Sequence, residues 1–228
     1  MKKIFSLLAS LLLTTLLSAQ TMVFHVRNVK AKEHSENEME KAYETCCSDM
    51  KPNKGGFALR VLGAGADNGM THQFLWYWEL GEDLWEGTNI DEKAALWWSQ
   101  MDNYVEEYGD QYLGRVLSRQ EGTNKDYKWT HIWDFKVDDA NQFKTGHDKI
   151  IKKFEKEFEG RSVGFGTYDI NRPDGATHWV GISGEGNHDH VMLMDKLQSQ
   201  SEFIKMLAER GKSENVKDYM VKDLKLIN

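Results

Sequence analysis

Four histidines recur as two pairs at one constant spacing, and an imidazole can hydrogen-bond a ligand, bind a metal or transfer a proton near neutral pH. His25 lies in Val-Phe-His-Val and His131 lies in Trp-Thr-His-Ile, at a spacing of 131 − 25 = 106 residues. His72 follows Asn-Gly-Met-Thr and His178 follows Asp-Gly-Ala-Thr, and 178 − 72 is again 106. Two independent landmarks with one offset indicate a tandem duplication.

The first pair, His25 and His131, falls inside two stretches rich in β-branched and aromatic residues, which are typical of strands. Each imidazole either faces the space between two sheets, where it would contact a ligand, or hydrogen-bonds within the core, as buried polar groups normally do. We predict that both point into the space between the sheets and are the polar contacts of a ligand there. Because side chains alternate along a strand, a shift of one residue would reverse this orientation.

The second pair, His72 and His178, opens two further predicted strands directly after a glycine turn. Two roles suit them: hydrogen bonding at the hairpin end together with Thr71 and Thr177, or lining one mouth of a barrel. A metal shared with the first pair is disfavoured, because antiparallel pairing separates His72 from His25 by several residues at roughly 3.3 Å each. The sequence therefore predicts no metal site.

Tryptophan is abundant, with 8 in 228 residues, and several fall on predicted strands. Large rings suit the wall of an apolar pocket that has few polar groups. On this basis Trp76 and Trp133 are candidate ligand-binding residues. Packing between a sheet and its helices would serve these rings equally well.

The elements that position these residues repeat as strand, helix, strand, strand, helix, strand. Spacing and composition predict them at 22–30, 33–50, 56–62, 72–80, 91–108 and 115–120, and again at 128–137, 139–158, 162–170, 178–183, 189–210 and 217–226. The short polar linker 121–126 favours two units that pack together. The predicted organisation is a signal peptide at 1–19 and two repeats, 20–122 and 123–228.

This element order is that of a ferredoxin-like unit, an antiparallel sheet with two helices on one face. Strand runs such as Phe74-Leu75-Trp76-Tyr77-Trp78 are apolar on both sides, so the second face is also expected to be covered. The chain thus resembles the dimeric α+β-barrel superfamily, as a fused tandem duplication. The resemblance implies an α+β fold in which two ferredoxin-like units pack sheet to sheet. Members of this superfamily include antibiotic-biosynthesis-type monooxygenases, stress-responsive barrel proteins and fused two-unit haem enzymes.

His147 lies on an apolar helical stripe with Phe143, Ile150 and Phe154, where the first repeat carries Tyr43. Some haem-binding members of the superfamily use an axial histidine on a helix, and the fused enzymes place it in their second half, so the resemblance makes haem a candidate cofactor and His147 its candidate ligand. The stripe itself predicts a core residue, and we expect a buried or half-buried His147 without a cofactor.

The N-terminus and the composition limit the functional classes. Lys2 and Lys3, an apolar run and then Ser18-Ala19 predict a secretory signal peptide, and hence an exported protein, periplasmic or secreted. No later run is long enough to span a membrane. A net charge of −7 argues against nucleic acid as a partner. The only two cysteines are adjacent, so a disulfide framework is not expected.

Function follows from the barrel rather than from a motif. We predict an exported α+β barrel that binds a small, largely apolar molecule between its sheets. A cofactor-free or haem-dependent oxygenase-like enzyme is one alternative, and a structural or interaction module with a solid core is another. The sequence shows no Ser-His-Asp order, phosphate-binding loop or paired cysteine ligands that would favour other enzymes.

Overall fold

A computed structural model describes residues 21–47, 49–67, 69–87 and 90–228. The predicted signal peptide at 1–19 lies outside these residues. Repeat 1 contains β1 (Met22–Ala31), α1 (Glu36–Cys47), β2 (Gly55–Leu62), β3 (His72–Glu79), α2 (Ile90–Met101) and β4 (Val105–Gln120). Repeat 2 contains β5 (Trp129–Val137), α3 (Ala140–Lys153), β6 (Val163–Ile170), the 3₁₀ turn η1 (Pro173–Gly175), β7 (His178–Gly184), α4 (Asn187–Gln198), α5 (Ser201–Glu209) and β8 (Ser213–Ile227).

The strands form one closed antiparallel barrel in the order β1-β3-β2-β8-β5-β7-β6-β4. Within it each repeat contributes a ferredoxin-like sheet, β4-β1-β3-β2 and β8-β5-β7-β6. The pairs β2–β8 and β4–β6 join the two sheets and leave no free edge. The predicted fold, two ferredoxin-like units packed as an α+β barrel, is confirmed.

The two repeats share their strand register as well as their element order. His25 pairs with Trp76 across β1 and β3, and His131 pairs with Ile182 across β5 and β7, so that both partners move by 106 residues. One side-chain bond repeats with them: Thr71 Oγ1 accepts from the Ala31 amide at 2.8 Å, and its counterpart Thr177 Oγ1 accepts from the Val137 amide at 3.0 Å.

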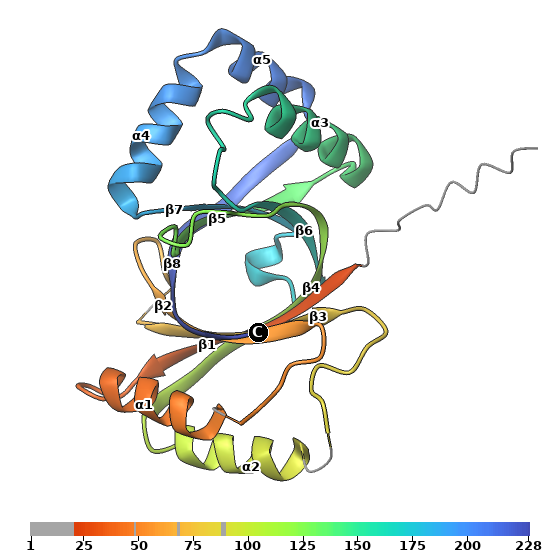
Figure 1. Ribbon diagram of the computed structural model, residues 1–228. Helices are drawn as coiled ribbons and strands as arrows, with labels where there is room; N and C mark the ends of the chain where they lie inside the picture. The colour runs from red at the N-terminus through yellow and green to blue at the C-terminus, as the bar shows by residue number, and fades with distance from the viewer. Residues whose placement is uncertain (1–20, 48, 68, 88–89) are drawn as a thin grey trace, which may run out of the picture.

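Helices cover the outer wall of the barrel on two opposite sides (Figure 1). Repeat 1 packs α1 and α2 onto its sheet, and repeat 2 packs α3, α4 and α5 onto the other. Their apolar faces explain this, because α1 buries Met39, Ala42, Tyr43 and Cys47 and α3 buries Phe143, His147 and Ile150. Asp139 caps α3 by accepting from the amides of Asn141 and Gln142. The barrel interior is therefore a compartment separate from two helix-covered cores.

Two predicted helices have different bounds in the structure. The helix predicted over 91–108 ends at Met101, and β4 begins at Val105. Tyr104, Val105 and Tyr108 continue the helical spacing by coincidence, whereas the backbone of Val105 and Tyr108 pairs with β1. The helix predicted over 189–210 is two helices, since the chain leaves helical geometry at Gln200, the N-cap of α5.

One end of the barrel is closed by the two hairpin connections. Seen along the barrel, η1 lies within the outline of the ring (Figure 1). Lys217 on β8 joins both connections, with its ammonium 2.5 Å from Asp67 and 2.9 Å from Asp174. Pro173 and Ala176 are buried beside them. The cavity described below therefore opens at the opposite end.

Candidate functional site

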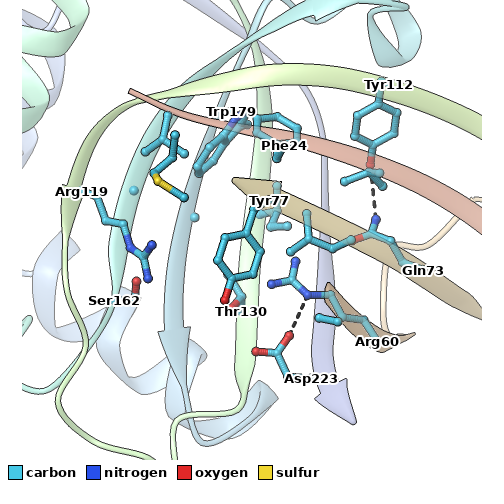
Figure 2. A pocket seen from close by; sticks show the side chains of 18 of the residues that line it. Phe24, Arg60, Gln73, Tyr77, Tyr112, Arg119, Thr130, Ser162, Trp179 and Asp223 are labelled. Atoms are coloured by element: carbon cyan, nitrogen blue, oxygen red, sulfur yellow. Dashed lines mark hydrogen bonds and ion pairs between the residues drawn. The ribbon is translucent and has the colours of Figure 1, made fainter. Parts of the chain in front are cut away.

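A cavity of about 250 Å³ occupies the interior of the barrel (Figure 2). Its walls come from all eight strands and from side chains that point away from the helices. Most of this surface is apolar, and the lining includes Phe24, Val26, Ala58, Leu75, Val116, Ile132, Trp179 and Leu226. Such a volume and lining suit a small, largely apolar ligand with few polar contacts.

Trp179 occupies its side of the cavity because glycines on the neighbouring strand leave it room. A Cβ atom added to Gly166 would lie 2.6 Å from the Trp179 ring, and one added to Gly164 would lie 3.1 Å from it. The indole packs edge to face against Phe24 with ring centroids 5.7 Å apart. The Trp179 ring thus fills the space that side chains at Gly164 and Gly166 of β6 would otherwise take.

A buried polar cluster lies toward the closed end of the cavity. Tyr112 and Tyr219 place their hydroxyls 3.2 Å apart, and the Gln73 side-chain amide donates to Tyr112 at 3.3 Å and to Asn28 at 3.1 Å. Burial raises the pKa of Tyr112 well above its ordinary value, so the phenol is neutral and acts as a hydrogen-bond donor or acceptor. These groups could meet a carbonyl or hydroxyl of a ligand.

Next to this cluster, Asp134 is fully buried and accepts a 2.6 Å hydrogen bond from the Tyr168 hydroxyl. Burial raises the pKa of Asp134 to about 6, and the Tyr168 bond and the nearby Lys217 charge oppose that rise. Its second carboxyl oxygen has no hydrogen-bond partner within the described chain. A carboxyl with a pKa near 6 can exchange a proton at neutral pH, so Asp134 is the strongest acid–base candidate of the interior.

The open end carries the charged residues of the lining. Arg60 pairs with Asp223 at 2.6 Å, and Arg119 reaches the same mouth from β4. In Figure 2 both guanidinium groups extend toward the phenol end of Tyr77, near Thr130 and Ser162. The side chains of Arg119 and Asp223 are 42% and 37% exposed, whereas Gln73 and Tyr112 at the far end are buried. Solvent therefore reaches the cavity on the arginine side.

The predicted orientation of His25 and His131 is wrong. Phe24 and Val26 on β1, and Thr130 and Ile132 on β5, face the cavity, so the alternating histidines face the helix layer. His25 packs against Trp76 with ring centroids 5.2 Å apart. His131 stacks on Trp133 at 3.7 Å, and its Nε2 lies 3.1 Å from an Asp218 carboxyl oxygen. Burial lowers the pKa of both imidazoles.

The other predicted ligand contacts also lie outside the cavity. His72 and His178 begin β3 and β7 as predicted, and the Nδ1 of each lies within hydrogen-bond distance of the hydroxyl of the preceding threonine, at 2.9 Å and 2.8 Å. This is the hairpin-end role. Trp76 packs beneath α1 and α2, and Trp133 packs beneath the helices of repeat 2, which is the sheet-to-helix alternative. Among the described residues, none of these four side chains lines the barrel cavity.

His147 is buried on α3, on the predicted stripe. Its ring lies 5.6 Å from Phe165, which stacks on Phe143 at 4.8 Å. Burial lowers the pKa of His147 to about 4, and its Nε2 has no hydrogen-bond partner in the described chain, both of which suit a metal ligand. However, these rings fill the space that a haem would need, and His147 lines neither the barrel cavity nor the groove between α3 and α5. The packing around His147 therefore does not fit haem.

Two other kinds of feature are absent from the described part of the chain. No group of three or more His, Cys, Asp and Glu side chains is placed to hold a metal ion there. No helix within the described ranges is long and apolar enough to cross a membrane.

The residues that form the cavity's polar contacts were not singled out by the sequence. One available signal was the repeat itself, because Tyr112 and Tyr219 occupy corresponding positions of β4 and β8. A second signal was a difference between the repeats. The residue of repeat 2 that corresponds to Arg60, 106 residues later, is Gly166.

No protein-family model and no curated protein matches the sequence. Solved structures do match the fold. A putative monooxygenase from Lactobacillus acidophilus NCFM aligns over 92% of this chain and 97% of its own, with a TM-score of 0.57 and 12% identity. An anthrone oxidase-like protein aligns over 91% and 92%, with a TM-score of 0.51 and 8% identity. A haem-binding protein from Thermus thermophilus aligns over 90% and 92%, with a TM-score of 0.50 and 9% identity. At these identities the likeness concerns the fold alone, an α+β barrel built from two ferredoxin-like units.

Proposed function

We propose that this protein binds a small, largely apolar molecule inside its barrel. The observation that carries the proposal is the interior cavity, with apolar walls, a polar cluster at its closed end and a mouth open to solvent. A solid interaction module would bury its inward-facing side chains against one another and leave no such space. The ligand contacts are the cavity side chains Phe24, Leu75 and Trp179 in place of the histidines predicted from the sequence. Export to the periplasm or beyond is part of the proposal and rests on the N-terminal sequence.

Filling the cavity tests this proposal. The probe is N-phenyl-1-naphthylamine, an uncharged molecule whose fluorescence rises in apolar surroundings. Val116→Trp adds a large ring to the cavity wall, and Asp110→Trp adds the same ring at an exposed position of the same strand. We expect saturable fluorescence with the wild type and Asp110→Trp, and at least a tenfold weaker affinity with Val116→Trp. Absent binding, or equal binding by all three folded proteins, would contradict the proposal.

An enzyme is the second candidate, and the Asp134–Tyr168 pair is the observation that favours it. Tyr168 lines the cavity and contacts a carboxyl whose pKa is about 6, so a proton can pass between a ligand and Asp134 through the phenol. The matching structures include an anthrone oxidase-like protein, which makes anthrone a reasonable probe substrate. Oxygen uptake with anthrone that exceeds the uncatalysed rate and is lost in Asp134→Asn would support an enzyme. Oxygen uptake at the uncatalysed rate would argue against an enzyme, and ligand binding would remain as the proposed function.

A further inference from the structure

We propose that the mouth of the barrel holds an anionic group of the ligand, so that the ligand is an apolar body carrying one carboxylate or a similar anion. This inference rests on the proposed function, because it assigns one end of a molecule whose remainder lies in the cavity. The anion would meet Arg119 first and Arg60 second, beside the hydroxyl groups of Tyr77, Thr130 and Ser162.

The sign of the charge at the mouth is opposite to that of the protein. The chain carries a net charge of −7, yet the charged residues that line the cavity are two arginines and one aspartate. Low-dielectric walls around such a group focus its field on whatever enters. The local excess of positive charge therefore favours an anion over a neutral or cationic ligand.

The internal repeat shows that these arginines are not required by the fold. The residue that corresponds to Arg60 is Gly166, at the offset of 106 that relates β2 to β6. The pairing of β1 with β4 and of β5 with β8 shows that β4 and β8 correspond at an offset of 107 residues. The residue of repeat 2 that corresponds to Arg119 is therefore Leu226. The same structural positions are thus filled without charge in the other repeat, and only one side of the mouth is basic.

The two arginines have different ion-pair partners, and Arg119 is the one that can bind a ligand anion. Arg60 is held by Asp223, and its side chain is 17% exposed. Arg119 contacts Glu121 at 2.9 Å, but the Glu121 side chain is 72% exposed. Exposed ion pairs contribute little free energy, so a ligand anion can replace Glu121 at small cost. A planar guanidinium then offers two parallel hydrogen bonds to a carboxylate.

Tyr77 indicates that both positive charges act at one point of the mouth. Burial raises the pKa of its phenol, the charges of Arg119 and Arg60 both oppose that rise, and the Asp223 charge and a hydrogen bond with Asn228 have smaller effects of opposite sign. The phenol is consequently a neutral hydrogen-bond donor that lies within the field of two guanidinium groups. A carboxylate seated there would receive hydrogen bonds from groups of both kinds.

Two probes of the same shape separate charge from apolar binding. Calorimetric titration with 2-naphthoate and with uncharged 2-naphthalenemethanol should show that the wild type prefers the anion by about tenfold or more, the scale of one charge-assisted hydrogen bond. Arg119→Gln should remove most of that preference. Arg115→Gln is the matched control, because Arg115 lies on the same strand, carries the same charge and pairs with Asp169 away from the cavity.

Asp223→Asn provides a test that misfolding cannot imitate. Removing this carboxylate frees Arg60 and takes a negative charge from the mouth, so the affinity for 2-naphthoate should rise several-fold while that for 2-naphthalenemethanol stays the same. Equal binding of both probes by the wild type, or a preference that survives in Arg119→Gln, would overturn this inference and leave the proposed function intact. Failure of both probes to bind would overturn both.

Discussion

Tyr112 and Tyr219 stand at corresponding positions of the two repeats, 107 residues apart, and their hydroxyls lie 3.2 Å from each other inside the barrel. The duplication therefore places a residue against its own copy. The pair connects β4 and β8, which lie on opposite sides of the ring of strands, at the closed end of the cavity, and both phenols are buried. Because each hydroxyl is part of the surroundings of the other, their contributions to stability should be coupled.

Replacing the two tyrosines one at a time and together tests that coupling. We expect Tyr112→Phe and Tyr219→Phe each to lower the free energy of unfolding by about 1 kcal/mol, because each leaves a buried hydroxyl with one partner fewer. The double variant should lose less than the two single losses combined, by about 0.5 kcal/mol or more. Urea unfolding of the four proteins measures this, and strictly additive losses would show that the hydroxyls do not interact.

Asp134 should make its own contribution to the pH dependence of stability. Its pKa is raised from 3.8 to about 6, so between these values the folded state binds more protons than the unfolded state. The contribution of Asp134 to the free energy of unfolding therefore falls as the pH rises from about 4 to 6, by an amount on the order of 3 kcal/mol. Asp134→Asn should remove this fall. If the difference between wild type and Asp134→Asn stays the same from pH 4 to 7, the assignment of the raised pKa is wrong.

His147 should have the opposite effect on the pH dependence of the free energy of unfolding, lowering it as the pH falls. Its pKa is lowered from 6.5 to about 4, so the unfolded state takes up a proton first when the pH falls below 6.5. Stability due to a neutral His147 is present above pH 6.5 and is lost toward pH 4, by an amount on the order of 3 kcal/mol. Urea unfolding of His147→Phe should show a weaker loss in acid than the wild type, with Lys152→Gln at an exposed position of the same helix as a control.

The same residue tests the haem alternative. Because Phe143 and Phe165 fill the space around His147, we expect haem titration to give no saturable Soret band. A saturable band that disappears in His147→Ala would contradict the packing described for repeat 2.

The sequence predicted the duplication, the element order and the barrel, since each depends on a pattern that recurs along the chain. It did not determine which face of each strand lines the cavity. His25 is flanked by apolar residues on a strand buried on both faces, so alternation alone could not assign its side. Tyr112 was missed for a different reason, because the apolar spacing of α2 continues through Tyr108 and hides the start of β4.

Gly166 illustrates a difference between the repeats that only the packing explains. A Cβ atom there would lie 2.2 Å from the Arg115 carbonyl oxygen and 2.6 Å from the Trp179 ring. Gly166→Ala should therefore lower the free energy of unfolding by about 2 kcal/mol. Gly181 also lines the cavity, but its nearest contact would be 3.4 Å away, so Gly181→Ala should change stability by less than about 1 kcal/mol. Similar losses in the two variants would contradict the tight approach of β6 to Trp179.

The proposed ligand occupies the barrel interior and not the helix-covered cores. Fluorine NMR of protein labelled with 5-fluorotryptophan tests this placement directly, because Trp179 lines the cavity whereas Trp76 and Trp133 lie beneath the helices. Variants of these three residues to Phe assign their resonances. During titration with N-phenyl-1-naphthylamine we expect the Trp179 resonance to shift saturably while those of Trp76 and Trp133 stay in place. A shift confined to Trp76 or Trp133, or no shift at saturating probe, would contradict a ligand site inside the barrel.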